Sequence, residues 1–212
     1  MDDVLQCEDI SFPQRGQKLF VSDSNYDETA QIGWKDVEGQ FYGYISGYKE
    51  AADDVIRSAL EKGKVGFGSL DKYVFPAVFL YRQYLELALK ELYLVYSEET
   101  EDEKSKVIKA CGHDLKKIWS KVKPIMSLGD SDPSISAVEY YVIEFAELDS
   151  SSYAFRYPID KKLNLVHAKP KRINLRNLAE RMNELAWFLE CAGTELEVRQ
   201  RDINEMRYYG FI

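Results

Sequence analysis

The 212-residue sequence contains few residues suited to metal, redox or covalent chemistry. It has two histidines, His113 and His167, and three cysteines, none of them in a Cys-x-x-Cys pair. It has no His-Glu-x-x-His motif and no Gly-x-Ser-x-Gly turn, and the acidic stretch 139–147 contains no histidine. These absences argue against zinc sites, di-metal carboxylate sites and serine hydrolases. We therefore expect neither a bound metal nor a cofactor.

The sequence also lacks a long hydrophobic run. The longest unbroken apolar stretch, Tyr73–Tyr81, has nine residues and is too short to span a bilayer. The first residues are acidic, whereas a signal peptide begins with basic residues. The cysteines are odd in number and widely spread, which is typical of reduced thiols. We predict a cytoplasmic protein without a membrane partner.

Basic residues are fewer than acidic ones, 28 against 36, which gives a net charge of −8. This balance argues against a protein that covers nucleic acid with its whole surface. Apolar residues make up 45% of the chain and aromatic residues 13%. That content excludes disorder over the whole chain, because burying it offsets the entropy lost on folding. We expect a soluble globular protein.

Hydrophobic residues recur at steps of three and four, which predicts helices over about 36–62, 70–97, 113–125, 135–148 and 174–196. The second segment is apolar on nearly all sides and should form the centre of a bundle. The acidic run 98–103 suggests a solvated loop. The last segment has a heptad-like seam, which packs either inside its own bundle or across a dimer. The pattern predicts one all-α domain of about five helices over 36–212, after a partly irregular extension over 1–35.

A long irregular segment, 149–173, holds an unusual concentration of positive charge. Seven basic residues and one acidic residue lie between Arg156 and Arg176, a net charge of +6 against −14 for the rest of the chain. Clustered cations suit phosphate groups, and nearby aromatic rings suit base stacking. The predicted binding residues here are Arg156, Tyr157, Asp160, Lys161 and Lys162. Alternatively, this loop lies against the acidic surface of the protein itself, including 98–103.

Three further charged positions could form a site. Arg82, Glu86 and Lys90 are spaced four residues apart, so they form either a surface ladder of ion pairs or, with Arg82 and Glu86, the polar lining of an interhelical cleft. His113 precedes Asp114 at a predicted helix start, which favours a capping role. His167 lies in the basic loop and could act as an acid or base beside Arg156.

Several strings together resemble an uncharacterised bacterial family and the HEPN superfamily. They are Gly47–Asp53 (GYKEAAD), Phe79–Leu87 (FLYRQYLEL) with Leu89-Lys90, Gly112–Leu115 (GHDL), Ser152–Lys161 (SYAFRYPIDK) and Ile173–Leu178 (INLRNL). The resemblance implies a helical bundle, frequent dimers, and links to RNA cleavage, nucleotide binding, phage defence or toxin–antitoxin systems. Ribonuclease members have an Arg followed a few residues later by a His on one helix, and neither histidine here stands so.

The favoured hypothesis is a HEPN-like binding or regulatory module, homodimeric and related to defence or toxin–antitoxin systems. It would engage RNA or nucleotide phosphates through the basic loop, and a protein encoded in the same operon would be a further partner. One alternative is a metal-independent ribonuclease with His113 or His167 as acid–base and Arg82 or Arg156 stabilising the phosphorane. The other is a structural dimerisation partner without a ligand.

Overall fold

The computed structural model describes residues 12–21, 25–33, 36–66, 68–126, 133–150 and 152–210. The chain divides into two units, residues 1–35 and residues 36–212. The described residues of the first unit form turns and irregular backbone, and all of them are exposed. Cys111 is buried and Cys191 is exposed, both as free thiols, whereas Cys7 lies outside the described residues.

The second unit is helical, as predicted, with six helices in its described residues. They are α1 Val37–Gly63, α2 Gly68–Tyr96, α3 Glu101–Cys111, α4 Leu115–Met126, α5 Pro133–Leu148 and α6 Leu175–Tyr208. Over the described ranges there is no strand, and the only β-type backbone pairing is an isolated antiparallel bridge between Ile159 and Leu165. None of these helices is both long and apolar enough to cross a membrane.

The helix that the sequence pattern missed is α3. The acidic run was expected to be a loop, but Thr100 caps a helix there: its side chain accepts a hydrogen bond from the Glu103 N–H. The Glu103 carboxylate in turn accepts one from the Thr100 N–H at 2.9 Å, which completes a capping box. Acidic residues in a first turn also interact favourably with the helix dipole. The same charges that suggested a solvated loop therefore stabilise a helix start.

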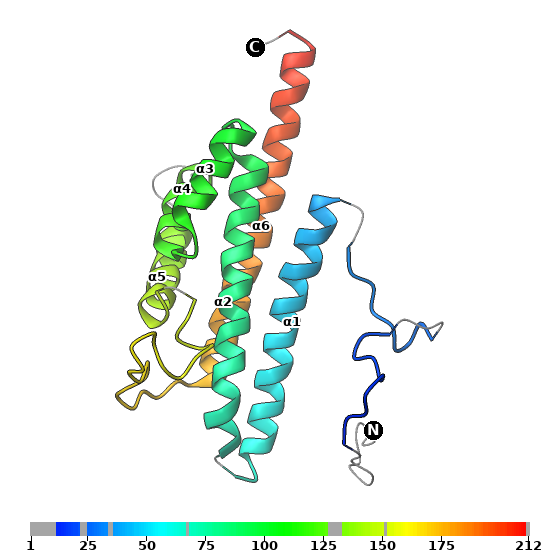
Figure 1. The fold of residues 1–212 in the computed structure, drawn as a ribbon. Helices are drawn as coiled ribbons and strands as arrows, with labels where there is room; N and C mark the ends of the chain where they lie inside the picture. Colours follow the sequence, from blue (N-terminus) through cyan, green and yellow to red (C-terminus); the bar gives the residue numbers. More distant parts are fainter. Residues whose placement is uncertain are drawn as a thin grey trace. The chain divides into compact units, whose positions relative to one another are not determined.

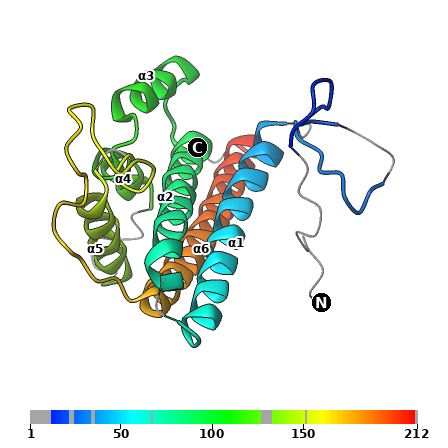
Figure 2. The same ribbon diagram turned by 60° about the horizontal axis from the view of Figure 1, so that its bottom comes forward.

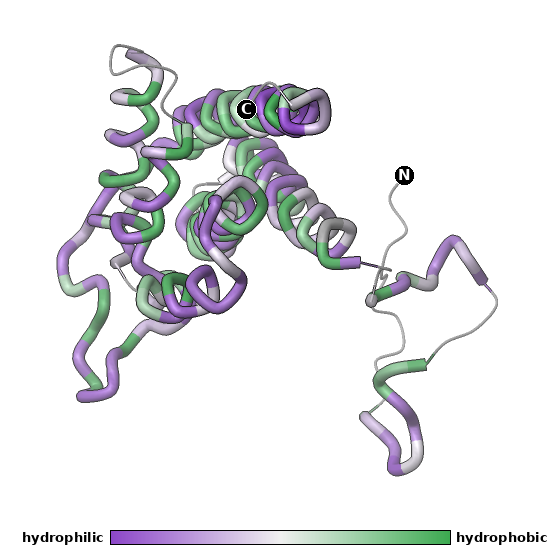
Figure 3. The backbone as a smooth tube through the Cα atoms, turned by 90° about the horizontal axis from the view of Figure 1, so that it is seen from above, coloured by the Kyte–Doolittle hydropathy of each residue, from purple (hydrophilic) through white to green (hydrophobic). Residues whose placement is uncertain are grey.

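Helix α2 is the centre of the bundle, as its nearly uniform hydrophobicity predicted. Helices α1, α4 and α6 all pack against it, and α1 and α2 form an antiparallel pair (Figures 1 and 2). Tyr81, Leu85 and Leu89 are completely buried along α2. Hydrophilic and hydrophobic residues are interspersed along the helices of the bundle (Figure 3), so each helix can present apolar residues to its neighbours.

Helix α6 begins where the Asn174 side chain accepts a hydrogen bond from the Asn177 N–H at 3.0 Å. The heptad-like seam of α6, including Met182, Leu189 and Leu196, is buried within the bundle of the same chain. Past Leu196 the helix continues to Tyr208 without a buried residue. The C-terminal end of α6 extends beyond the neighbouring end of α2 (Figure 1).

Candidate functional site

The basic loop joins α5 to α6, and its tip is an ordered hairpin built by Asp160. The carboxylate of Asp160 accepts hydrogen bonds from the N–H groups of Lys162 at 2.7 Å and Asn164 at 2.9 Å. The Asp160 N–H donates to the Asn164 carbonyl, and Leu163 takes a left-handed conformation with φ of 64°. The hydrogen bonds from Asn164 and Lys162 hold the pKa of Asp160 below its usual value. Asp160 therefore shapes the loop that presents the neighbouring lysines.

The predicted binding cations lie on the outside of this hairpin. Arg156, Lys161 and Lys162 are exposed, and the Arg156 guanidinium lies 5.5 Å from the centre of the Tyr157 ring. Tyr157 stacks on Tyr153 with ring centres 4.7 Å apart. Within the described part of the chain, none of the seven cations of 156–176 forms an ion pair with a carboxylate. No described carboxylate therefore forms a direct ion pair with the loop, as a loop bound to the acidic surface of the protein would require for salt bridges.

His167 fixes the loop to α2. Its Nε2 lies 2.9 Å from the Ala154 carbonyl and donates to it, since a carbonyl oxygen only accepts. Its ring centre lies 5.0 Å from that of Phe155 and 6.0 Å from that of Phe75 on α2. The Nε2 atom is therefore occupied by a hydrogen bond inside the loop. It is not free for the predicted acid–base role of His167.

Arg82 and Glu86 form a buried ion pair, which contradicts, for these two residues, the alternative of a surface ladder. The Arg82 side chain is fully buried, and its Nη1 donates to Glu86 Oε2 at 3.0 Å. Its Nη2 donates to the His113 carbonyl, and its Nε donates to the Asp149 carbonyl at 3.5 Å. Burial lowers the pKa of Arg82, although the Glu86 and Asp149 charges oppose that shift. All three nitrogens of the guanidinium are occupied inside the protein, so Arg82 holds α2, the α3–α4 turn and the end of α5 together.

His113 completes this cluster instead of capping a helix. The cap of α4 is Asp114, whose carboxylate accepts hydrogen bonds from the N–H groups of Lys116 and Lys117. His113 Nδ1 lies 2.8 Å from Glu86 Oε1, which also accepts from Lys90 Nζ at 2.7 Å. The predicted capping role of His113 is therefore wrong. Its side chain is 64% exposed, and its Nε2 has no hydrogen-bond partner among the described residues.

Glu86 remains ionised in this cluster despite its burial. Burial raises the pKa of the carboxyl group, but hydrogen bonds from Lys90 and His113 and the charges of Lys90 and Arg82 lower it by more. The net result is a pKa below the ordinary value of 4.5. The ion pair of Arg82 and Glu86 is therefore fully formed at neutral pH.

Asp149 and Ser152 attach the start of the basic loop to α2. Asp149 Oδ1 accepts hydrogen bonds from the N–H groups of Tyr153 at 2.9 Å and Ala154 at 3.2 Å. The Ser152 hydroxyl accepts from Gln83 Nε2 on α2 at 2.7 Å. Asp149 Oδ2 is buried without a hydrogen-bond partner. These contacts position the loop whose far end carries the exposed cations.

The strings that carried the family resemblance supply many of these structural contacts. Lys49 and Asp53 of the first string are joined at 2.6 Å, and the Tyr81 hydroxyl of the second donates to Asp53 at 2.5 Å. Burial and the Asp53 charge raise the pKa of Tyr81. Arg82 and Glu86 contact the Gly-His-Asp-Leu string in the same way. The polar residues of these strings therefore hold helices and loop together.

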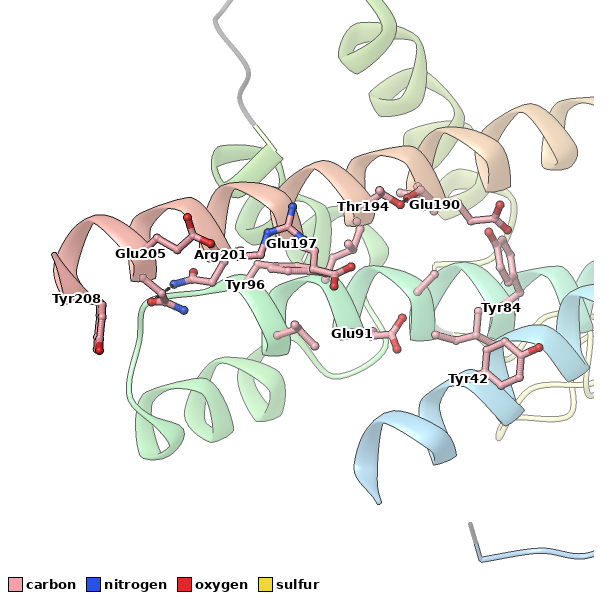
Figure 4. Close-up of a pocket in the computed structure, with 18 of the residues that line it drawn as sticks. Tyr42, Tyr84, Glu91, Tyr96, Glu190, Thr194, Glu197, Arg201, Glu205 and Tyr208 are labelled. Carbon is pink, nitrogen blue, oxygen red and sulfur yellow. Dashed lines mark hydrogen bonds between the residues drawn. The ribbon is translucent and has the colours of Figure 1, made fainter. Parts of the chain in front are cut away.

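The sequence does not predict the groove that the structure shows between three of the helices. A groove of about 1190 Å³ lies between α1, α2 and α6 (Figure 4). It is lined by several acidic side chains with one arginine among them, namely Glu91, Glu190, Glu197, Glu205 and Arg201. This excess of carboxylates is unfavourable for phosphate. Its residues come from three helices far apart in sequence, and only the packing of the helices brings them together.

The fold and these sites define an all-α bundle with a structured basic loop. In the residues that the structure describes, no group of three His, Cys, Asp or Glu side chains could hold a metal ion. Comparisons of the chain with models of known protein families, with curated proteins and with solved structures found no match.

Proposed function

We propose that this protein is a helical binding module that engages RNA or nucleotide phosphates through the hairpin of its basic loop. The observation that carries the proposal is that the seven cations of 156–176 have no carboxylate partner in the described residues. The chain as a whole has a net charge of −8, so a cluster of unneutralised cations in it needs an explanation. Binding of phosphate supplies one.

The geometry of the hairpin supports phosphate as the ligand. Its backbone is held by Asp160 before any ligand binds, which reduces the entropy lost when the lysines engage an anion. Lys161 and Lys162 would neutralise phosphates and release their condensed counterions. Tyr157 is 49% exposed beside Arg156 and offers a ring face on which an unpaired base can stack.

The proposal includes a HEPN-like relationship, with homodimers, a partner from the same operon and a defence or toxin–antitoxin role as its further expectations. It does not include RNA cleavage. Arg82 is buried and paired, and His167 Nε2 is bonded to a carbonyl, so two of the four residues expected for that chemistry are engaged inside the protein. His113 and Arg156 remain exposed but belong to different parts of the chain.

The test is the affinity for a fluorescent single-stranded RNA and for ATP, measured across a series of salt concentrations. We expect log K to fall linearly with log salt. Each of the substitutions Arg156→Ala, Lys161→Ala and Lys162→Ala should weaken binding and lower the salt slope by about 1. Tighter binding of RNA than of ATP identifies single-stranded RNA as the ligand, and tighter binding of ATP identifies a nucleotide.

Lys109→Ala is the matched control, because Lys109 is an exposed lysine on α3 without an ion pair in the described residues. It should leave both affinities unchanged. Absence of RNA and ATP binding at low salt would refute the proposal. So would an equal loss of affinity in Lys109→Ala, since this would show that only net charge matters.

A further inference from the structure

A cavity of about 800 Å³ lies beneath the second half of the basic loop, away from the hairpin tip. It is lined by the end of α1, the first turns of α2, the end of α5, the loop and the start of α6. Most of its floor is apolar and comes from these helices, with Leu60, Leu70, Val74 and Leu175. A cavity of this size and lining is typical of a site for a small molecule.

One wall of this cavity is aromatic. Phe75 is 43% exposed, although its ring centre lies only 6.2 Å from that of the buried Phe155. His167 lies against both rings and is held by its hydrogen bond to the Ala154 carbonyl. Phe155 and His167 thus support Phe75, whose partly exposed ring offers apolar surface to a flat or aliphatic group.

The rim of the cavity is positively charged. Lys169, Lys171 and Arg172 are exposed lining residues, and none forms an ion pair with a carboxylate of the described residues. The one acidic residue among the lining residues is Asp71. An apolar floor next to three cations and one carboxylate favours a ligand with an apolar body and a negative head.

We infer that this cavity binds a small amphiphilic anion. Its aromatic or aliphatic body lies on the Phe75 wall, and its carboxylate, sulfonate or phosphate lies on Lys171 and Arg172. This site is distinct from the hairpin tip, where Lys161 and Lys162 lie, so the loop serves two ligands with its two halves. The inference does not depend on RNA binding.

The probe is 8-anilinonaphthalene-1-sulfonate, which combines an aromatic body with one negative charge. We expect it to bind the native full-length chain at one saturable site, with a rise in its fluorescence. Its neutral relative N-phenyl-1-naphthylamine should bind about tenfold more weakly, because it makes no charge-assisted hydrogen bond to the rim. Circular dichroism confirms that each protein tested is folded.

Two double variants with the same change of charge separate the two halves of the loop. Lys171→Glu with Arg172→Glu should weaken binding of the sulfonate probe by at least about tenfold. Lys161→Glu with Lys162→Glu should leave it unchanged while abolishing RNA binding. Phe75→Ala removes the aromatic wall and keeps the charges of the rim. It should weaken the binding of both probes.

Displacement of the sulfonate probe by octanoate, phenyl phosphate or AMP then identifies the class of natural ligand. Failure of the probe to saturate would overturn the inference. Equal affinities in the wild type and in the Lys171→Glu, Arg172→Glu variant would also overturn it. Neither result would affect the RNA proposal, whose failure would appear only in the RNA titrations.

Discussion

Arg82 and Glu86 illustrate how burial changes the weight of a common ion pair. On an exposed helix surface, charges spaced four residues apart contribute only tenths of a kcal/mol. Here both side chains are almost completely removed from water, and their hydrogen bonds are shared with Lys90 and His113. Removing one partner of such a pair leaves the other charge buried and uncompensated, which costs about 3–5 kcal/mol.

The first prediction concerns Glu86→Gln. At neutral pH we expect this substitution to lower the free energy of unfolding by about 3 kcal/mol. Because the folded-state pKa of Glu86 is lowered, its contribution is present above the unfolded-state pKa and is lost as pH falls through the folded value. The difference between wild type and Glu86→Gln should therefore shrink below about pH 4.5. Urea unfolding of both proteins at several pH values measures this difference in the free energy of unfolding.

Glu50→Gln is the control for this measurement, because Glu50 is an exposed carboxylate on α1 without an ion pair in the described residues. It should change the free energy of unfolding by less than about 0.5 kcal/mol at every pH. A pH-independent effect of Glu86→Gln would contradict the ionic origin of its contribution.

At the scale of elements, α3 depends on its capping box. The helix has eleven residues and few buried side chains, so it gains little from packing. Isolated helices of this length are marginal in water. Its N-terminal hydrogen bonds therefore account for a larger share of its stability than those of the long central helices.

The second prediction is that Thr100→Ala destabilises the protein by about 1 kcal/mol, because the Glu103 N–H loses its partner at the helix start. Hydrogen exchange should accelerate most at the first turns of α3. Thr100→Ser keeps the hydroxyl group and should behave like the wild type. Unchanged exchange in α3 of the Thr100→Ala variant would show that packing alone maintains this helix.

At the scale of the whole molecule, the two units differ in character. The described residues of unit 1 are all exposed, whereas the buried hydrophobic residues of unit 2 run from Ala52 to Leu196.

The charge of the molecule is distributed unevenly at this scale. The segment 156–176, which covers most of the basic loop and the start of α6, has a net charge of +6, and the groove between α1, α2 and α6 is lined by carboxylates with one arginine. The net charge of −8 therefore describes neither surface. The two proposed ligand sites both lie on the positive loop, one at its tip and one beneath its second half.

The sequence by itself determined the helical class and the central position of α2, because helical periodicity is a property of near neighbours along the chain. The Thr-x-x-Glu pattern of the capping box, Thr100 to Glu103, is also present in the sequence. The negative charge of this run, however, favours the prediction of a solvated loop. The cluster of basic residues in 156–176 is likewise evident from local composition, whereas their exposure is seen only in the structure.

Only the tertiary structure decided which polar residues meet. Glu86 and His113 are 27 residues apart, and Arg82 reaches a carbonyl 67 residues away. No periodic pattern encodes such pairs, since they depend on how α2 packs against the α3–α4 turn and the end of α5. The cavity beneath the loop arises in the same way, from side chains of four helices and one loop that packing brings together.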